Sequence, residues 1–221
     1  MPTGDDLLPF DPKKPPKANP QGVAVVGNKA YVTLNNLGTD YAGAGPALLL
    51  VVDVRAWTKD KLIVLSGKDA KAACPVRENK NLLWVSTAGT FLPETFTYQG
   101  DGVVEVLDVT EDKVVKTIES GGAPGVLSES GSGIIWATNL KDGSALRFDL
   151  ANEKALEPLS VCPSDQTYNF VADVAGDGKG LVYLACFGTD QIKVIPETGE
   201  TDNALILDVG DGPTSLLVVP Q

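Results

Sequence analysis

The side chains available for catalysis are restricted in this chain, because the sequence contains no histidine. Ser-His-Asp and Cys-His nucleophile pairs, histidine-ligated zinc and histidine-ligated haem are therefore excluded. Any chemistry would depend on carboxylates, lysine, tyrosine or cysteine. We predict no catalytic residues, no metal site and no cofactor.

Three cysteines are present, and all are expected near one face of the fold: Cys74 at the start of a first strand, Cys162 at the end of a fourth strand and Cys186 at the end of a second strand. Since no histidine can activate Cys74, we interpret it as buried packing rather than as a nucleophile. Cys162 and Cys186 fall in adjacent repeat units. A disulfide between them is one expectation and would indicate export, while two separate buried thiols are the alternative.

Two long insertions, residues 35–45 and 87–101, belong to adjacent repeat units and are expected to meet. They carry four aromatic residues that we predict as a binding surface: Tyr41, Phe91, Phe96 and Tyr98. Exposed aromatic side chains on a rigid scaffold are typical of binding sites. The alternative is that the two loops only pack against each other.

The elements that position these insertions repeat along the chain. An aromatic residue inside a short apolar run recurs at intervals of about 50 residues, a spacing typical of propeller blades. The four aromatic residues are Tyr31, Trp84, Trp136 and Tyr183. Between them, β-branched runs alternate with turns rich in Gly, Asn and Asp, and helical periodicity is absent. The sequence therefore predicts an all-β protein built from four-stranded antiparallel blades.

We predict a β-propeller domain over residues 20–221, with four blades and the first strand of a fifth. The blades span residues 22–66, 72–119, 125–161 and 170–209, and the extra strand spans residues 213–220. A blade that is begun but not finished leaves unpaired strand edges. We expect further blades of a longer protein, or a second polypeptide, to complete the ring. The alternative is an unusual pairing of the last strand.

Three of the expected third strands end in an aspartate just before a turn: Asp53, Asp108 and Asp149. An aspartate at this place accepts hydrogen bonds from backbone amides of the turn. We therefore predict a structural role for all three residues rather than a catalytic one.

These repeats resemble the YVTN-type β-propeller family. The resemblance rests on Gly-Val-Ala-Val at residues 22–25, Ala-Tyr-Val-Thr-Leu-Asn at 30–35 and Val-Val-Asp-Val at 51–54, and residues 103–125 repeat the passage from one blade into the next. Residues 69–74 and 167–170 depart from the family pattern, because they lack the Gly-x-Pro sequence that precedes the first strand of a blade. The resemblance implies a bacterial or archaeal surface or periplasmic protein, mostly a binding module, with a more distant likeness to lactonases and quinoprotein dehydrogenases.

Composition narrows the possible partners. The net charge of −11 argues against nucleic acid or an anionic membrane as a partner, and no apolar run is long enough for a spanning helix. The first residues do not form a signal segment, although one could precede this sequence. The Pro-rich residues 1–19 are expected to form a linker or tether, with a lipid anchor upstream as one version.

We therefore predict a non-catalytic, exported β-propeller, located in the periplasm or at the cell surface. It would bind another protein, or take part in a surface assembly, through loops 35–45 and 87–101. The alternative is a metal-dependent, lactonase-like or other hydrolytic propeller with carboxylates near the central channel. The expected inner strands are mainly apolar and supply only Glu129 and Asp173 for such a site.

Overall fold

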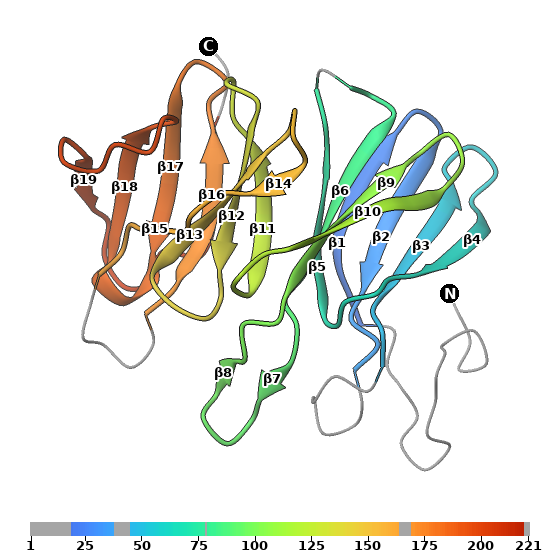
Figure 1. Ribbon diagram of the computed structural model, residues 1–221, viewed down its shortest axis with the longest axis horizontal. Helices are drawn as coiled ribbons and strands as arrows, with labels where there is room; N and C mark the ends of the chain where they lie inside the picture. Colours follow the sequence, from blue (N-terminus) through green and yellow to red (C-terminus); the bar gives the residue numbers. More distant parts are fainter. Residues whose placement is uncertain (1–18, 38–44, 78, 164–168, 219–221) are drawn as a thin grey trace. The chain divides into compact units, whose positions relative to one another are not determined.

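The computed structural model describes residues 19–37, 45–77, 79–163 and 169–218, and these residues form an all-β structure. The chain divides into two compact units, residues 1–123 and 124–221. Each unit holds two blades (Figure 1). The described residues form no helix that is long and apolar enough to cross a membrane.

The first unit contains blades 1 and 2, each an antiparallel sheet of four strands. Blade 1 consists, in chain order, of β1 (Pro20–Val26), β2 (Lys29–Leu34), β3 (Leu48–Asp53) and β4 (Thr58–Val64). Blade 2 consists of β5 (Ala70–Pro75), β6 (Leu82–Thr87), β9 (Val103–Asp108) and β10 (Lys113–Glu119). A small hairpin, β7 (Phe91–Leu92) and β8 (Thr97–Tyr98), is inserted between β6 and β9.

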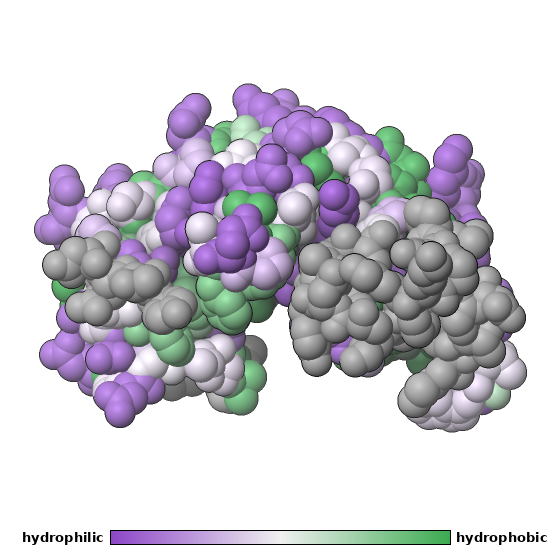
Figure 2. All heavy atoms as spheres, turned by 90° about the horizontal axis from the view of Figure 1, so that it is seen from below, coloured by the Kyte–Doolittle hydropathy of each residue, from purple (hydrophilic) through white to green (hydrophobic). Residues whose placement is uncertain are grey.

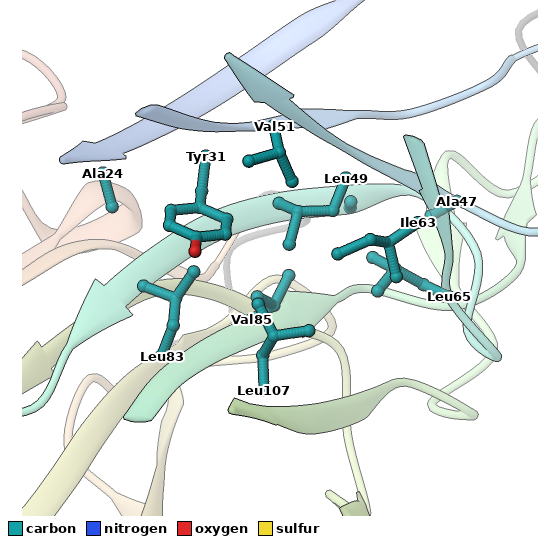
Figure 3. Packing of buried hydrophobic residues seen from close by; sticks show 11 residues of the cluster. Ala24, Tyr31, Ala47, Leu49, Val51, Ile63, Leu65, Leu83, Val85 and Leu107 are labelled. Atoms are coloured by element: carbon teal, nitrogen blue, oxygen red, sulfur yellow. The ribbon is translucent and has the colours of Figure 1, made fainter. Parts of the chain in front are cut away.

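Blades 1 and 2 pack face to face through alternate apolar side chains of their strands. Tyr31, with no exposed surface, lies in this core and points towards Leu83 of blade 2 (Figure 3). Its hydroxyl donates a hydrogen bond of 2.7 Å to Oδ1 of Asp112, which also forms an ion pair with Lys29. The aromatic residue of the second strand of blade 1 therefore lies between the two neighbouring sheets.

A buried carboxylate forms a second link between these blades. Glu105 on β9 accepts a hydrogen bond of 2.9 Å from the backbone N–H of Ser66, which follows β4. Burial raises the pKa of Glu105 above its ordinary value, and the hydrogen bonds from the backbone at Ser66 and Gly67 oppose that rise. The carboxylate therefore connects the outer strand of blade 1 to the third strand of blade 2.

The second unit contains blades 3 and 4. Blade 3 consists of β11 (Pro124–Glu129), β12 (Ile134–Asn139), β13 (Ser144–Asp149), β14 (Lys154–Ala155) and the short β15 (Leu159–Ser160). Blade 4 consists of β16 (Val171–Gly176), β17 (Leu181–Cys186), β18 (Gln191–Pro196) and β19 (Leu205–Asp208). Trp136 of β12 is fully buried in the core between them, together with Val174, Val182 and Leu184 of blade 4.

The structure departs from the predicted strands in two places. The fourth strand of blade 3, expected to run continuously to residue 161, is split into β14 and β15, because Pro158 between them has no N–H to donate to the ladder. The extra strand expected at 213–220 is not paired as a strand over its described residues, 213–218. There Leu216 donates its backbone N–H to Oδ2 of Asp173, at 2.7 Å.

The aspartates at the ends of the third strands have the predicted structural role. Asp53 accepts the backbone N–H groups of Arg55 and Ala56, and Asp108 and Asp149 accept those of Thr110 and Asn152, at 2.7 to 3.0 Å. Hydrogen bonds from these turns lower the pKa of all three carboxyls. The turn prediction is therefore confirmed at each position.

Candidate functional site

The hairpin β7–β8 projects from the end of blade 2 at which β6 ends and β9 begins (Figure 1). Phe91 pairs with Tyr98, and Leu92 pairs with Thr97. Figure 2, seen from the side on which the hairpin lies in Figure 1, shows hydrophobic residues among hydrophilic ones. The insertion predicted as a long loop is therefore an ordered two-stranded element.

The base of the hairpin is closed by a carboxylate that binds the chain opposite it. Asp101 accepts the backbone N–H of Thr90 at 2.7 Å and its hydroxyl at 2.8 Å. Burial alone would raise the pKa of Asp101, but the hydrogen bonds from Thr90 bring the pKa below its ordinary value. A glycine is required at residue 89, since a Cβ there would lie 2.3 Å from Oδ1 of Asp101. This closure fixes the direction in which the hairpin leaves the blade.

Three aromatic side chains gather on the hairpin. The ring of Phe91 contacts those of Phe96 and Tyr98 edge to face, with centroids 5.3 Å apart in both pairs. Phe91 and Tyr98 are half-buried, whereas Phe96 remains 69% exposed. The cluster thus supports Phe96 from behind and leaves most of its ring open to solvent.

Tyr98 anchors the hairpin to the connection between β4 and β5. Its hydroxyl donates to Oδ2 of Asp69 at 2.7 Å, and Nζ of Lys71 lies 3.0 Å from the same oxygen. Nζ of Lys71 also lies 5.6 Å from the centre of the Tyr98 ring. Asp69 is only 3% exposed, so this contact is largely shielded from water. Burial, followed by the charge of Asp69, raises the pKa of Tyr98, and the hydroxyl remains a donor.

The structure gives different roles to the predicted binding residues. Phe91, Phe96 and Tyr98 lie together, as one surface requires, but only Phe96 is strongly exposed. Tyr98 holds the hairpin in place, and Phe91 joins the two other rings. Tyr41 lies outside the described residues.

Two of the three cysteines are joined in a disulfide, and the third lies in the other unit. Cys162 and Cys186 form a disulfide within the second unit, with Cα atoms 5.5 Å apart, and both residues are fully buried. Cys74, at the end of β5, is buried and takes part in no disulfide among the described residues.

The two carboxylates considered for a hydrolytic site belong to neighbouring strands of blades 3 and 4. Glu129 ends β11, and its carbonyl lies next to Gly176 on β16. Asp173 lies three residues before Gly176 on the same strand, which corresponds to about 10 Å along the backbone, and its Oδ2 accepts the backbone N–H of Leu216. Burial raises the pKa of Asp173, while the backbone N–H groups of Leu216 and Val174 oppose the rise. Within the described ranges, no group of three acidic, histidine or cysteine residues is placed to hold a metal ion.

The sequence interpretation missed one strongly exposed aromatic residue and one cleft. Trp57, in the turn between β3 and β4, is 80% exposed and has a φ of 54°. The sequence signal that could have identified Trp57 is its position in the turn between two expected strands. At the end of β6 opposite the hairpin, a cleft of about 670 Å³ is lined by residues that include Lys29, Arg77 and Lys80. This cleft and the hairpin therefore lie at opposite ends of the blades.

Comparison with solved structures identifies the fold of this chain. No family model matches the chain, and no curated protein does. Among solved structures it is similar to the dihydro-heme d1 dehydrogenase NirN in complex with DHE, with a TM-score of 0.55, 14% identity and coverage of 77% of this chain and 34% of that one. It is also similar to Kuenenia stuttgartiensis hydrazine synthase, with a TM-score of 0.57, 12% identity and coverage of 86% and 50%.

Both of these structures are β-propeller proteins. The chain has a β-propeller fold. At 14% and 12% identity the similarity is one of fold alone. The chain spans 34% of the length of NirN and 50% of the length of the hydrazine synthase chain. The predicted fold class, all-β with four-stranded antiparallel blades, is therefore confirmed.

Proposed function

We propose that this chain is a non-catalytic, exported β-propeller with YVTN-type repeats, which binds another protein through the β7–β8 hairpin. The observation that carries the proposal is the exposure of Phe96, 69%, on a hairpin whose base is fixed. An exposed aromatic ring gains binding energy when a partner covers it. The loop at 35–45, the second part of the predicted binding surface, lies mostly outside the described residues, which end at 37 and resume at 45.

The fixed base favours binding, because little conformational freedom remains to be lost. Asp101 closes the hairpin through Thr90, and Tyr98 joins it to Asp69. A surface held in its binding conformation before contact loses less entropy when the partner arrives. The geometry thus supports a preorganised recognition element.

Export is supported by the disulfide between Cys162 and Cys186, since disulfides persist in oxidising compartments. The periplasm and the cell surface both fit this chemistry. The partner would be another protein or the blades that complete the ring.

The proposal is tested by comparing Phe96→Ala with Trp57→Ala in a binding experiment. The full protein would be expressed in its native cells with an affinity tag, cross-linked and purified with its bound proteins. We expect Phe96→Ala to lose a specific partner that the wild type and Trp57→Ala retain. Trp57 is a matched control, because it is also exposed and aromatic but lies in the turn after β3. Equal recovery by both variants would contradict the proposal.

A further inference from the structure

The outer strand of blade 4 differs from the outer strands of blades 1 and 2. In β19, three consecutive aliphatic residues are exposed: Leu205 by 58%, Ile206 by 49% and Leu207 by 43%. Outer strands usually carry charges that prevent pairing with other chains. The strand β4 carries Lys59, Asp60 and Lys61, and β10 carries Lys113 and Lys116. The first three residues of β19 carry no charge, and the charge of this strand is confined to Asp208 at its end.

The register of β19 shows which backbone groups face outward. In the ladder between β18 and β19, Ile192 lies opposite Leu207 and Val194 lies opposite Leu205. Just beyond the strand, Val209 donates its N–H to the carbonyl of Asp190 at 3.0 Å, which identifies a hydrogen-bonded pair. Such pairs recur at every second residue in an antiparallel ladder, so residues 207 and 205 face β18. The N–H and C=O groups of Ile206 and Asp208 therefore point away from the sheet.

The side chains beside this edge form an apolar strip on one face of blade 4. Leu205 and Leu207 lie on the same face of the strand, next to Val194 and Ile192 of β18. Val194 is buried and Ile192 is half-buried. An added strand with alternate apolar side chains would continue this strip and cover Leu205 and Leu207.

The negative charge around the outer edge of β19 favours a positively charged partner segment. Asp202 precedes β19, Asp208 ends it and Asp211 follows it, and all three are exposed. The net charge of the chain is −11, so pairing with a second copy would bring two strongly negative molecules together. A segment with Lys or Arg on both sides of its apolar residues would be attracted instead.

We propose that β19 accepts an extended segment of another protein as a fifth strand of blade 4. The segment has alternate apolar side chains and is flanked by Lys or Arg. Backbone hydrogen bonds to Ile206 and Asp208 supply the pairing, and the aspartates select the flanking charges. This site belongs to the second unit and does not depend on the hairpin of the first.

The test uses a fluorescein-labelled peptide with the sequence Lys-Val-Thr-Val-Thr-Val-Lys, blocked at both ends, and the full protein. We expect it to bind at least tenfold more tightly than the same peptide with Glu in place of both lysines. Ile206→Lys and Ile206→Pro should each weaken binding at least tenfold. Proline at 206 removes only an outward N–H, so the bond pattern with β18 is kept. Val115→Lys, on the outer strand of blade 2, should bind as the wild type does.

A second measurement uses the wild-type protein only. Hydrogen exchange at the amides of Ile206 and Asp208 should slow at least tenfold when the peptide is added. Binding that leaves these two amides unprotected would overturn the proposal, and so would failure of the lysine-flanked peptide to bind. Concentration-dependent protection of the same amides without peptide would assign the edge to a second copy and would also overturn it.

Discussion

The roles of Tyr98 and Phe96 can be separated by their effects on stability. The Tyr98 hydroxyl donates to Asp69, which is 3% exposed. When the hydroxyl is removed, Lys71 is the side-chain partner that Asp69 keeps among the described residues. A hydrogen bond to a charged group contributes about 1.5–3 kcal/mol, so Tyr98→Phe should lower the free energy of unfolding of the first unit by about 2 kcal/mol. Phe96→Ala removes a mostly exposed ring and should change it by less than about 0.5 kcal/mol.

The assay is urea unfolding followed by tryptophan fluorescence, together with hydrogen exchange at the Thr90 and Gln99 amides of the hairpin. Tyr183→Phe is a control from blade 4, since its hydroxyl makes no hydrogen bond within the described residues; it should stay within about 0.5 kcal/mol of the wild type. Equal losses for Tyr98→Phe and Phe96→Ala would refute the distinction between anchor and exposed ring. A loss below about 0.5 kcal/mol for Tyr98→Phe would do the same.

Two further predictions concern stability. Cys162→Ser with Cys186→Ser should lower the stability of the second unit by about 3.5 kcal/mol, the loop-closure value for a sequence separation of 24, and unchanged urea unfolding would contradict the cross-link. Burial raises the pKa of Glu105 in the folded state above the pKa of the unfolded chain, which is about 4.3. The stability that this raised pKa contributes is fully present below the unfolded pKa and is lost as the pH rises through the folded pKa. Glu105→Gln should therefore become more stable relative to the wild type as the pH rises from 4 to 8, and a constant difference would exclude this account.

Much of the fold could be predicted because its signals are local. The recurring aromatic residues and the strand alternation predicted the blades, and Asp53 bonds its turn two residues further along the chain, within the range of a sequence motif. The break in the fourth strand of blade 3 was also visible as Pro158, but the apolar residues on both sides of it favoured one continuous strand. These features depend on neighbours in the sequence.

The site was less predictable, because its geometry depends on distant partners. The sequence grouped Phe91, Phe96 and Tyr98 by type, yet Tyr98 is held by Asp69, which lies 29 residues before it in the chain. The outward groups of β19 follow from its register with β18, and no local pattern specifies that register. Trp57 lies in the short turn between β3 and β4, so insertion length, the signal that predicted the binding surface, does not indicate it.

The most direct test of protein binding by the hairpin is site-specific photo-cross-linking in the native cells. A photoreactive phenylalanine would replace Phe96 in one variant and Trp57 in another. We expect a discrete cross-linked product with one partner protein at position 96, and no such product at position 57. The absence of a product at 96, or the same set of products at both positions, would contradict the central claim.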